Sequence, residues 1–124
     1  MKIRTSVMLV YSVALVTLLG LAACGGGGGG GGSGTTSSVQ VSWTANRETA
    51  VNSPGGGYKV YYSSTAGFNI ASANVIDVPY AAGATPTSTT LSLLTGTHYI
   101  KVIAYSTLNP GGSTPSAEIA ITAP

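Results

Sequence analysis

Charged side chains are scarce in this chain, at 6% of its 124 residues, and most catalytic chemistry depends on them. The sequence contains one histidine, one cysteine and three carboxylates, Glu48, Asp77 and Glu118, which lie in separate parts of the chain. An enzyme needs a nucleophile with a base, paired carboxylates or a bound metal. A zinc site needs three or four suitable ligands. We therefore expect a protein that is not an enzyme and has no metal site and no cofactor.

The balance of charge also argues against a nucleic-acid partner. Two of the five basic residues, Lys2 and Arg4, lie in an N-terminal segment that we expect to be removed, which leaves three basic and three acidic residues. Nucleic-acid binding needs clustered lysines and arginines. A neutral chain also offers little charge repulsion against self-association.

The N-terminal segment has the features of an export signal. Lys2 and Arg4 precede an uncharged, largely apolar stretch from Val7 to Ala23. A transmembrane helix, which needs about 20 apolar residues, is the alternative. The small residues at the end of the stretch, and the distinct sequence after it, favour a signal peptide over residues 1–23.

A single cysteine cannot form an intrachain disulfide, and its position suggests another role. Leu21, Ala22, Ala23 and Cys24 resemble the lipobox of bacterial lipoproteins. The resemblance implies a diacylglycerol on the Cys24 thiol, cleavage just before this residue and acylation of the new amine. Each buried methylene contributes about 0.8 kcal/mol, so two or three fatty chains would hold the protein on a membrane. By resemblance to the sorting rule of lipoproteins in enteric Gram-negative bacteria, Gly25 in place of an aspartate favours the outer membrane or cell surface.

A glycine run follows the cysteine. Residues 24–34 contain an unbroken run from Gly25 to Gly32, then Ser33 and Gly34. Such a segment favours a flexible tether, with a root-mean-square span of about 16–19 Å and a stretched reach of about 34 Å. A phosphate-binding glycine loop would need a strand before it and a helix with Lys-Ser/Thr after it, and neither pattern is present.

Residues 35–124 show the alternation of apolar and polar residues that is typical of β-strands with one buried face. No stretch after Gly25 has an apolar stripe of helical period. Pro79 limits its strand to a sheet edge. The expected class is an all-β antiparallel sandwich. The predicted strands are 39–43, 58–62, 75–80, 87–94, 98–105 and 117–121.

The order of these features resembles a fibronectin type III domain, an immunoglobulin-like sandwich, over about residues 36–123. Trp43 falls where that family keeps its core tryptophan, at the end of strand B. Tyr58–Tyr62 is similar to strand C. Gly96–Tyr105 is similar to the turn into strand F, and Ser113–Ser116 to the start of strand G.

The predicted structural core consists of Trp43, Tyr58, Val60, His98 and Val102. The resembled family has a buried tyrosine near the start of strand F whose hydroxyl bonds back to the backbone. Either His98 or Tyr99 can occupy this slot. The alternation through Ile100 and Val102 favours His98, as a structural group rather than a ligand or base.

The first strand of the resembled fold is short or missing, because glycines occupy its place. Thr35 to Ser38 supply one or two residues of it at most. An uncovered strand edge is either hydrated or filled by a strand from another protein or another copy.

Tyr61, Tyr99 and Tyr105 form the candidate binding surface, since all three are predicted to point outward. Pairing of the strands that resemble C and F would place Tyr61 on one face with Tyr99 and Ile103. Tyrosines are enriched at interfaces, and they also stabilise sheets as cross-strand pairs.

Two long loops, Ala45–Gly57 and Ser106–Thr114, are expected at the two ends of the sheets. The leading hypothesis is a noncatalytic, membrane-anchored surface lipoprotein for protein interaction or adhesion. One alternative is a structural subunit that assembles into a filament or matrix by strand donation. The other is a polysaccharide-binding module that uses the tyrosines.

Overall fold

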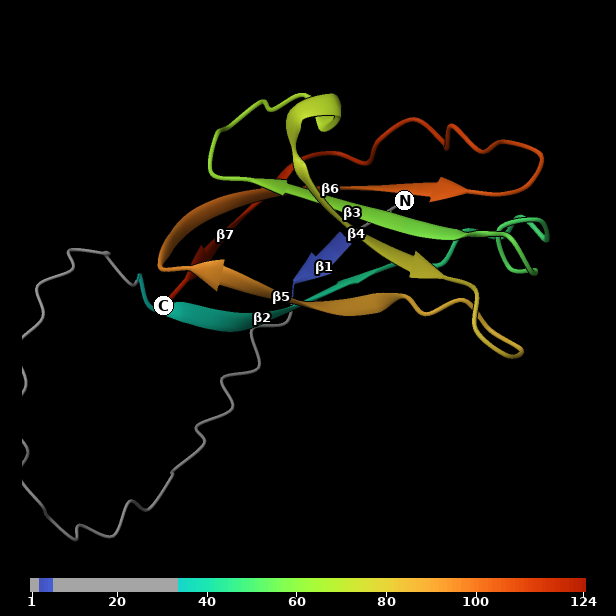
Figure 1. The fold of residues 1–124 in the computed structure, drawn as a ribbon, viewed down its shortest axis with the longest axis horizontal. Helices are drawn as coiled ribbons and strands as arrows, with labels where there is room; N and C mark the ends of the chain where they lie inside the picture. Colours follow the sequence, from blue (N-terminus) through green and yellow to red (C-terminus); the bar gives the residue numbers. More distant parts are fainter. Residues whose placement is uncertain (1–2, 6–33) are drawn as a thin grey trace, which may run out of the picture.

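Alternating β-branched and polar residues build two antiparallel sheets that pack face to face (Figure 1). The computed structural model describes residues 3–5 and 34–124. The first sheet has the order β1-β2-β5 and the second the order β4-β3-β6-β7. The strands are β1 (Ile3–Thr5), β2 (Thr36–Trp43), β3 (Gly57–Ser63), β4 (Asn74–Pro79), β5 (Ser88–Leu94), β6 (Gly96–Tyr105) and β7 (Ile119–Ala123), with a short 3-10 helix, η1, at Ile70–Ser72.

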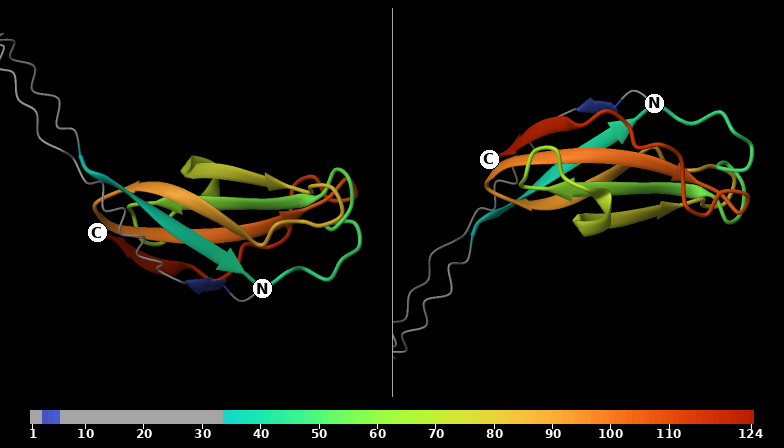
Figure 2. Two further views of the ribbon diagram at one scale, coloured as in Figure 1. Left: turned by 90° about the horizontal axis from the view of Figure 1, so that it is seen from below. Right: turned by 90° about the horizontal axis from the view of Figure 1, so that it is seen from above.

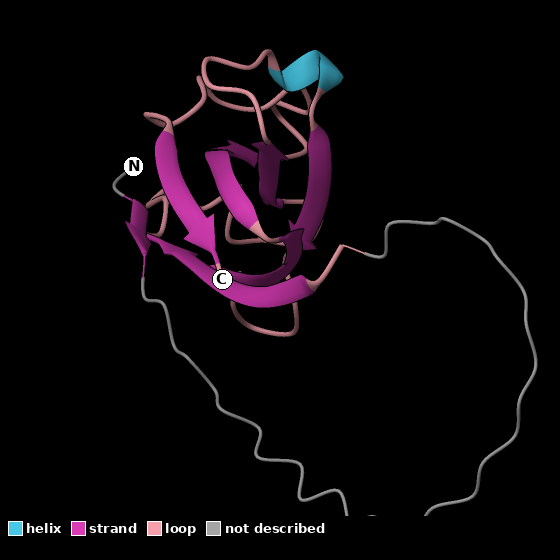
Figure 3. Ribbon diagram, turned by 90° about the vertical axis from the view of Figure 1, so that its left-hand side faces the viewer, coloured by secondary structure: helices cyan, strands magenta, loops and turns pink. Residues whose placement is uncertain are grey.

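This arrangement is an immunoglobulin-like antiparallel sandwich, as the sequence predicted. Each predicted strand overlaps a strand of the structure, and Figure 3 shows the two sheets facing one another. Strand β4 lies at an edge of its sheet and ends at Pro79. Proline has no backbone N–H to donate, so it cannot take part in a full hydrogen-bonded ladder on both sides of a strand. It is therefore accommodated at a sheet edge.

The core lies between the two sheets. The Trp43 and Tyr58 rings meet edge to face, with centroids 5.3 Å apart. Burying a side chain such as Leu91 contributes about 1.5–3 kcal/mol. The core cluster consists of Val39, Val41, Trp43, Val51, Tyr58, Val60, Val78, Leu91, Leu93, Ile100, Val102, Ala104, Ile121 and Ala123.

The position of the first strand differs from the expectation. Thr36–Ser38 belong to β2 and pair with β5, so they supply none of the missing strand. The place beside β2 is instead taken by β1, which comes from the segment expected to be the signal peptide. Ile3 lies opposite Trp43, antiparallel, and packs against the core.

The two long loops lie at one end of the sandwich, not at opposite ends as expected. In the β3–β6 ladder, Gly57 is opposite Tyr105, so the start of β3 and the end of β6 coincide. The chain enters Gly57 from the first loop and leaves Tyr105 into the second. Both views in Figure 2 show these loops together, at the end remote from the start of β2.

Candidate recognition surfaces

Tyr61 and Tyr99 lie on the outer face of the four-stranded sheet. Tyr61 pairs with Lys101 across β3 and β6, and Tyr99 pairs with Ser63 in the same ladder. The two tyrosines are therefore diagonal neighbours with their rings on one face, a separation of about 7–8 Å between backbones. Both side chains are half-buried.

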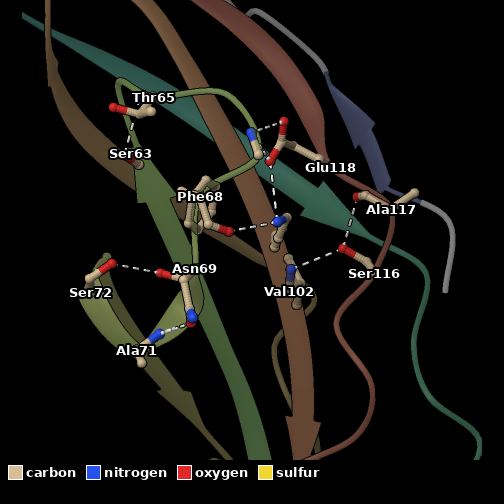
Figure 4. Close-up of polar contacts among 12 residues, drawn as sticks. Ser63, Thr65, Phe68, Asn69, Ala71, Ser72, Val102, Ser116, Ala117 and Glu118 are labelled. Carbon is tan, nitrogen blue, oxygen red and sulfur yellow. Dashed lines mark hydrogen bonds and ion pairs between the residues drawn. The ribbon is translucent and has the colours of Figure 1, made fainter.

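A loop between β3 and η1 folds over this face next to Lys101. The Lys101 ammonium donates to the Phe68 carbonyl at 2.8 Å and lies 4.6 Å from the centre of the Phe68 ring. Figure 4 shows Phe68 and Glu118 converging on this point from different segments. Phe68 is thereby buried, although it belongs to a loop that is otherwise mostly exposed.

Glu118 closes the same cluster. One carboxylate oxygen lies 3.3 Å from the Lys101 ammonium, and both oxygens accept from the Gly67 N–H at 3.0 Å. The hydrogen bond from Gly67 is the main cause that lowers the pKa of Glu118. The hydrogen bond from Lys101 and its positive charge lower this pKa further, while partial desolvation opposes the shift. The cluster fixes the loop over the sheet and leaves Lys101 engaged on three sides.

Tyr105 is less available than the sequence suggested. It is half-buried, its ring lies 5.3 Å from the Lys59 ammonium, and its hydroxyl donates to Asp77. Burial raises the pKa of Tyr105 to about 12, aided by the hydrogen bond to Asp77 and by the negative charge of that carboxylate. Tyr105 therefore belongs to a cross-strand cluster of β4, β3 and β6.

Ile103 lies on the outer face, as the strand pairing implied, yet it is only 2% exposed. The loop after β6 covers it at Gly112, whose φ is +84°. A β-carbon at this position would lie 2.5 Å from Ile103 Cδ1. The outer face thus offers Tyr61 and Tyr99 for contact, while Ile103 and Tyr105 are covered or engaged.

The loop end of the sandwich contains a cleft that we name the loop-end cleft. Its volume is about 690 Å³, and its lining has four hydroxyl side chains, one amide and one cation, Arg47. The alternation pattern shows where strands begin and end but not which ends meet. The antiparallel pairing of β3 and β6 supplies that information. The lining residues are Thr44, Ala45, Asn46, Arg47, Ser113, Thr114, Pro115 and Ser116.

One wall of this cleft is fixed to β6 by serine hydroxyls. Ser113 Oγ accepts from the Ala104 N–H at 3.1 Å, and Ser116 Oγ accepts from the Val102 N–H at 3.0 Å. These side chains continue the pairing of β6 where no regular strand lies beside it. The segment is thus an ordered wall rather than a loose loop.

His98 makes a side-chain contact with the backbone upstream of β6. A ring nitrogen, Nε2, lies 2.8 Å from the Leu94 carbonyl, four residues upstream. Tyr99 points to the other face of β6. His98 is half-buried and lies outside the core cluster, because it stands at the start of β6 beside a hollow of about 280 Å³. The other predicted core residues, Trp43, Tyr58, Val60 and Val102, are buried.

Cys24 and its predecessors Leu21, Ala22 and Ala23 lie outside the described residues. In the described part of the chain, no three side chains of His, Cys, Asp or Glu gather closely enough to hold a metal ion. No helix among the residues described has the length and apolarity needed to cross a membrane.

The fold defines the class of this protein as a small immunoglobulin-like β-sandwich. No protein-family model matches the chain, and no curated protein sequence matches it significantly.

Proposed function

We propose that this protein is an exported lipoprotein, held at the outer membrane or cell surface by acyl chains on Cys24, whose fibronectin type III-like sandwich binds other proteins without catalysis. The Leu21–Cys24 sequence supports the anchor, by its resemblance to a lipobox. The Gly25–Gly34 segment supports a spacer between lipid and sandwich. The absence of clustered carboxylates or histidines from the sequence supports a role in recognition.

The observation that carries this proposal is the direction in which the sandwich extends from its tether. The chain enters β2 at Thr36, directly after the glycine segment, and leaves it at Trp43, directly before the loop-end cleft. Seven steps of about 3.3 Å place the cleft about 23 Å beyond the tether. The cleft is therefore at the end of the sandwich remote from the chain's own tether.

The lining of the cleft indicates the kind of partner. The Thr114 hydroxyl, the Asn46 amide and the Arg47 guanidinium present hydrogen-bonding groups with one positive charge. Because recognition loops held on rigid scaffolds are the usual binding elements of such domains, we assign contact to this end. The partner surface is polar, with a carboxylate positioned to meet Arg47.

The anchor is tested by labelling cells with a palmitate analogue and determining the intact mass of the product. We expect label on the wild type, a mature chain that begins at Cys24, and loss of both in Cys24→Ser. A wild-type product that still begins at Met1, or label that persists after Cys24→Ser, would refute the anchor.

The binding surface is tested by cross-linking intact cells and identifying proteins captured with the acylated chain. An Arg47→Ala/Thr114→Ala variant should lose the captured protein, whereas Thr122→Ala, an exposed change on β7, should retain it. Loss on Tyr61→Ala/Tyr99→Ala alone would move the contact to the tyrosine face. Glycan-array binding that depends on those tyrosines would replace the protein partner with a polysaccharide.

A further inference from the structure

Strand β1 shows that the edge of β2 accepts an added strand. Three residues pair in antiparallel register, with Ile3 opposite Trp43, Arg4 opposite Ser42 and Thr5 opposite Val41. Ile3 is half-buried and packs on the core cluster. Both views in Figure 2 place β1 beside the end of β2, on the side where β7 lies. The position is therefore a strand slot with an apolar floor.

The slot matters because of the processing at Cys24, on which this inference rests. Cleavage before Cys24 removes residues 1–23 and β1 with them. Strand β2 then becomes the edge of its sheet, and the surface under Ile3 is uncovered. Exposed strand edges with apolar neighbours readily pair with another chain.

The hydrogen-bonding direction of β2 shows which groups face the slot. The Trp43 N–H donates to the Thr87 carbonyl at 2.9 Å, so Trp43 faces β5. Backbone groups alternate in direction along an antiparallel strand, so Val41 and Val39 also face β5, whereas Gln40 and Ser38 face the opposite edge. The edge of β2 therefore presents a regular row of donors and acceptors.

The sequence of β2, Thr-Ser-Ser-Val-Gln-Val-Ser-Trp, contains none of the features that prevent edge pairing. It has no lysine or other charge and no proline, which are the usual means of blocking an edge. The inward residues of β2 are Val39, Val41 and Trp43. A second strand in the slot can turn its own apolar residues to the same face, as Ile3 does. The processed chain has three basic and three acidic residues, so two copies repel each other little.

We propose that a second copy of this chain occupies the slot, with the two β2 strands pairing edge to edge in antiparallel orientation. A two-fold axis relates the copies, so each supplies the same surface to the other. Inward residues face inward residues, because a one-residue slip would turn the valines to solvent. The three-stranded sheet thereby becomes one continuous sheet across the dimer.

The tethers are long enough for this arrangement. They leave from opposite ends of the paired strands, with the two Thr36 positions about 26 Å apart when Gln40 lies opposite Gln40. Each glycine segment stretches to about 34 Å, so both Cys24 anchors reach the same membrane. In this dimer the β2 strands run along the bilayer, and the loop-end cleft of each copy lies near the tether of the other.

The test places one cysteine on the outer face of β2 in the full-length chain. Gln40 is exposed and faces Gln40 of the second copy at about 5–8 Å in the central registers. Thr90 is the matched control, because it is exposed and directly opposite Gln40 on β5. In the dimer, two copies of Thr90 are separated by three strand spacings, about 14 Å. Cys24 is acylated and does not react.

A short bismaleimide added to cells should link Gln40→Cys chains into a dimer of twice the monomer mass and leave Thr90→Cys chains monomeric. Adding Cys24→Ser to Gln40→Cys keeps residues 1–23, and β1 with them, so the dimer band should be lost. Palmitate label and intact mass are recorded on the same samples.

Each result decides the proposal. A labelled, processed Gln40→Cys protein that stays monomeric overturns the dimer and leaves the lipoprotein proposal standing. A cross-linked product of any other mass would show that the slot holds a different partner and not a second copy. Equal dimer bands for both cysteine positions indicate crowding on the membrane and overturn the β2 interface. A wild-type chain that retains its first 23 residues overturns both proposals.

Discussion

The hydroxyl of Tyr58 accepts a 2.6 Å hydrogen bond from the backbone N–H of Asn46. Tyr58 is a fully buried residue of β3, and Asn46 lines the loop-end cleft. The Asn52 side chain donates to the Asn46 carbonyl at 2.7 Å, which secures the same residue from its other side. The wall of the cleft is thus fixed to the hydrophobic core.

Replacing Tyr58 with phenylalanine should therefore destabilise the domain and loosen the cleft. The Asn46 N–H loses its acceptor, at an expected cost of about 1–3 kcal/mol. Urea denaturation followed by tryptophan fluorescence measures this change. Tyr61→Phe, on the half-exposed outer face, should stay within about 0.5 kcal/mol of wild type. Equal effects of the two substitutions would show that the hydrogen bond is not the cause.

Glu118 should make stability depend on acid. Its folded pKa lies below the usual value, so its contribution is present at neutral pH and is lost as the pH falls through the folded pKa. Thermal denaturation between neutral and acid pH should show a smaller acid loss in Glu118→Gln than in wild type. Glu48→Gln, in an exposed loop, is the control and should retain the wild-type profile. An unchanged profile in Glu118→Gln would show that the Gly67–Glu118–Lys101 cluster is not the source of the loss of stability in acid.

Tyr105 should make stability depend on alkali. Its pKa rises from 10.0 to about 12 in the folded protein, so folding favours the protonated phenol. This contribution is complete below pH 10 and is lost as the pH rises toward 12. Absorbance titration should resolve a late tyrosine step in wild type that disappears in Tyr105→Phe. A late step that survives this substitution would assign the shift to another tyrosine.

Gly112→Ala should destabilise the loop that covers Ile103. Alanine at a φ of +84° costs about 1–2 kcal/mol, and the contact of its β-carbon with Ile103 Cδ1 adds about 1–3 kcal/mol. Gly83→Ala measures the cost of the positive φ alone, because Gly83 has a φ of +99° and open space around its β-carbon position. Chemical denaturation should show the larger loss for Gly112→Ala. Equal losses would mean that Ile103 moves aside freely.

Local patterns were enough to predict the class of fold, because period-two alternation and the Gly/Pro breaks define strands without any long-range information. They also placed Trp43 and Tyr58 in the core and Pro79 at an edge. What the sequence could not provide was the meeting of distant loops. Asn46 and Ser113 line one cleft only because β3 and β6 run antiparallel. The engagement of Tyr105 likewise depends on Asp77 from a neighbouring strand, which alternation alone does not reveal.

The pairing of Ile3–Thr5 with β2 was also beyond reach of sequence reasoning. The charged, apolar-flanked N-terminus is typical of an export signal, and nothing in that pattern predicts a role in the sandwich. The segment fits the slot because Ile3 lies opposite Trp43 and Thr5 lies opposite Val41, which are both inward-facing positions of β2. Its placement shows that one stretch of chain carries both an export pattern and the geometry of an edge strand.

Pro124 lies beside the start of β2, where its carbonyl accepts from the hydroxyls of Ser37 at 2.5 Å and Thr95 at 3.2 Å. A reporter fused after Pro124 would consequently emerge beside the start of β2, at the end of the sandwich remote from the loop-end cleft. A tag inserted between Ala82 and Gly83 would lie at the opposite end, in the turn after β4. The closeness of Pro124 to the start of β2 makes the sandwich suitable for circular permutation, with Pro124 joined to Thr36 through a brief linker and new ends opened between Ala82 and Gly83.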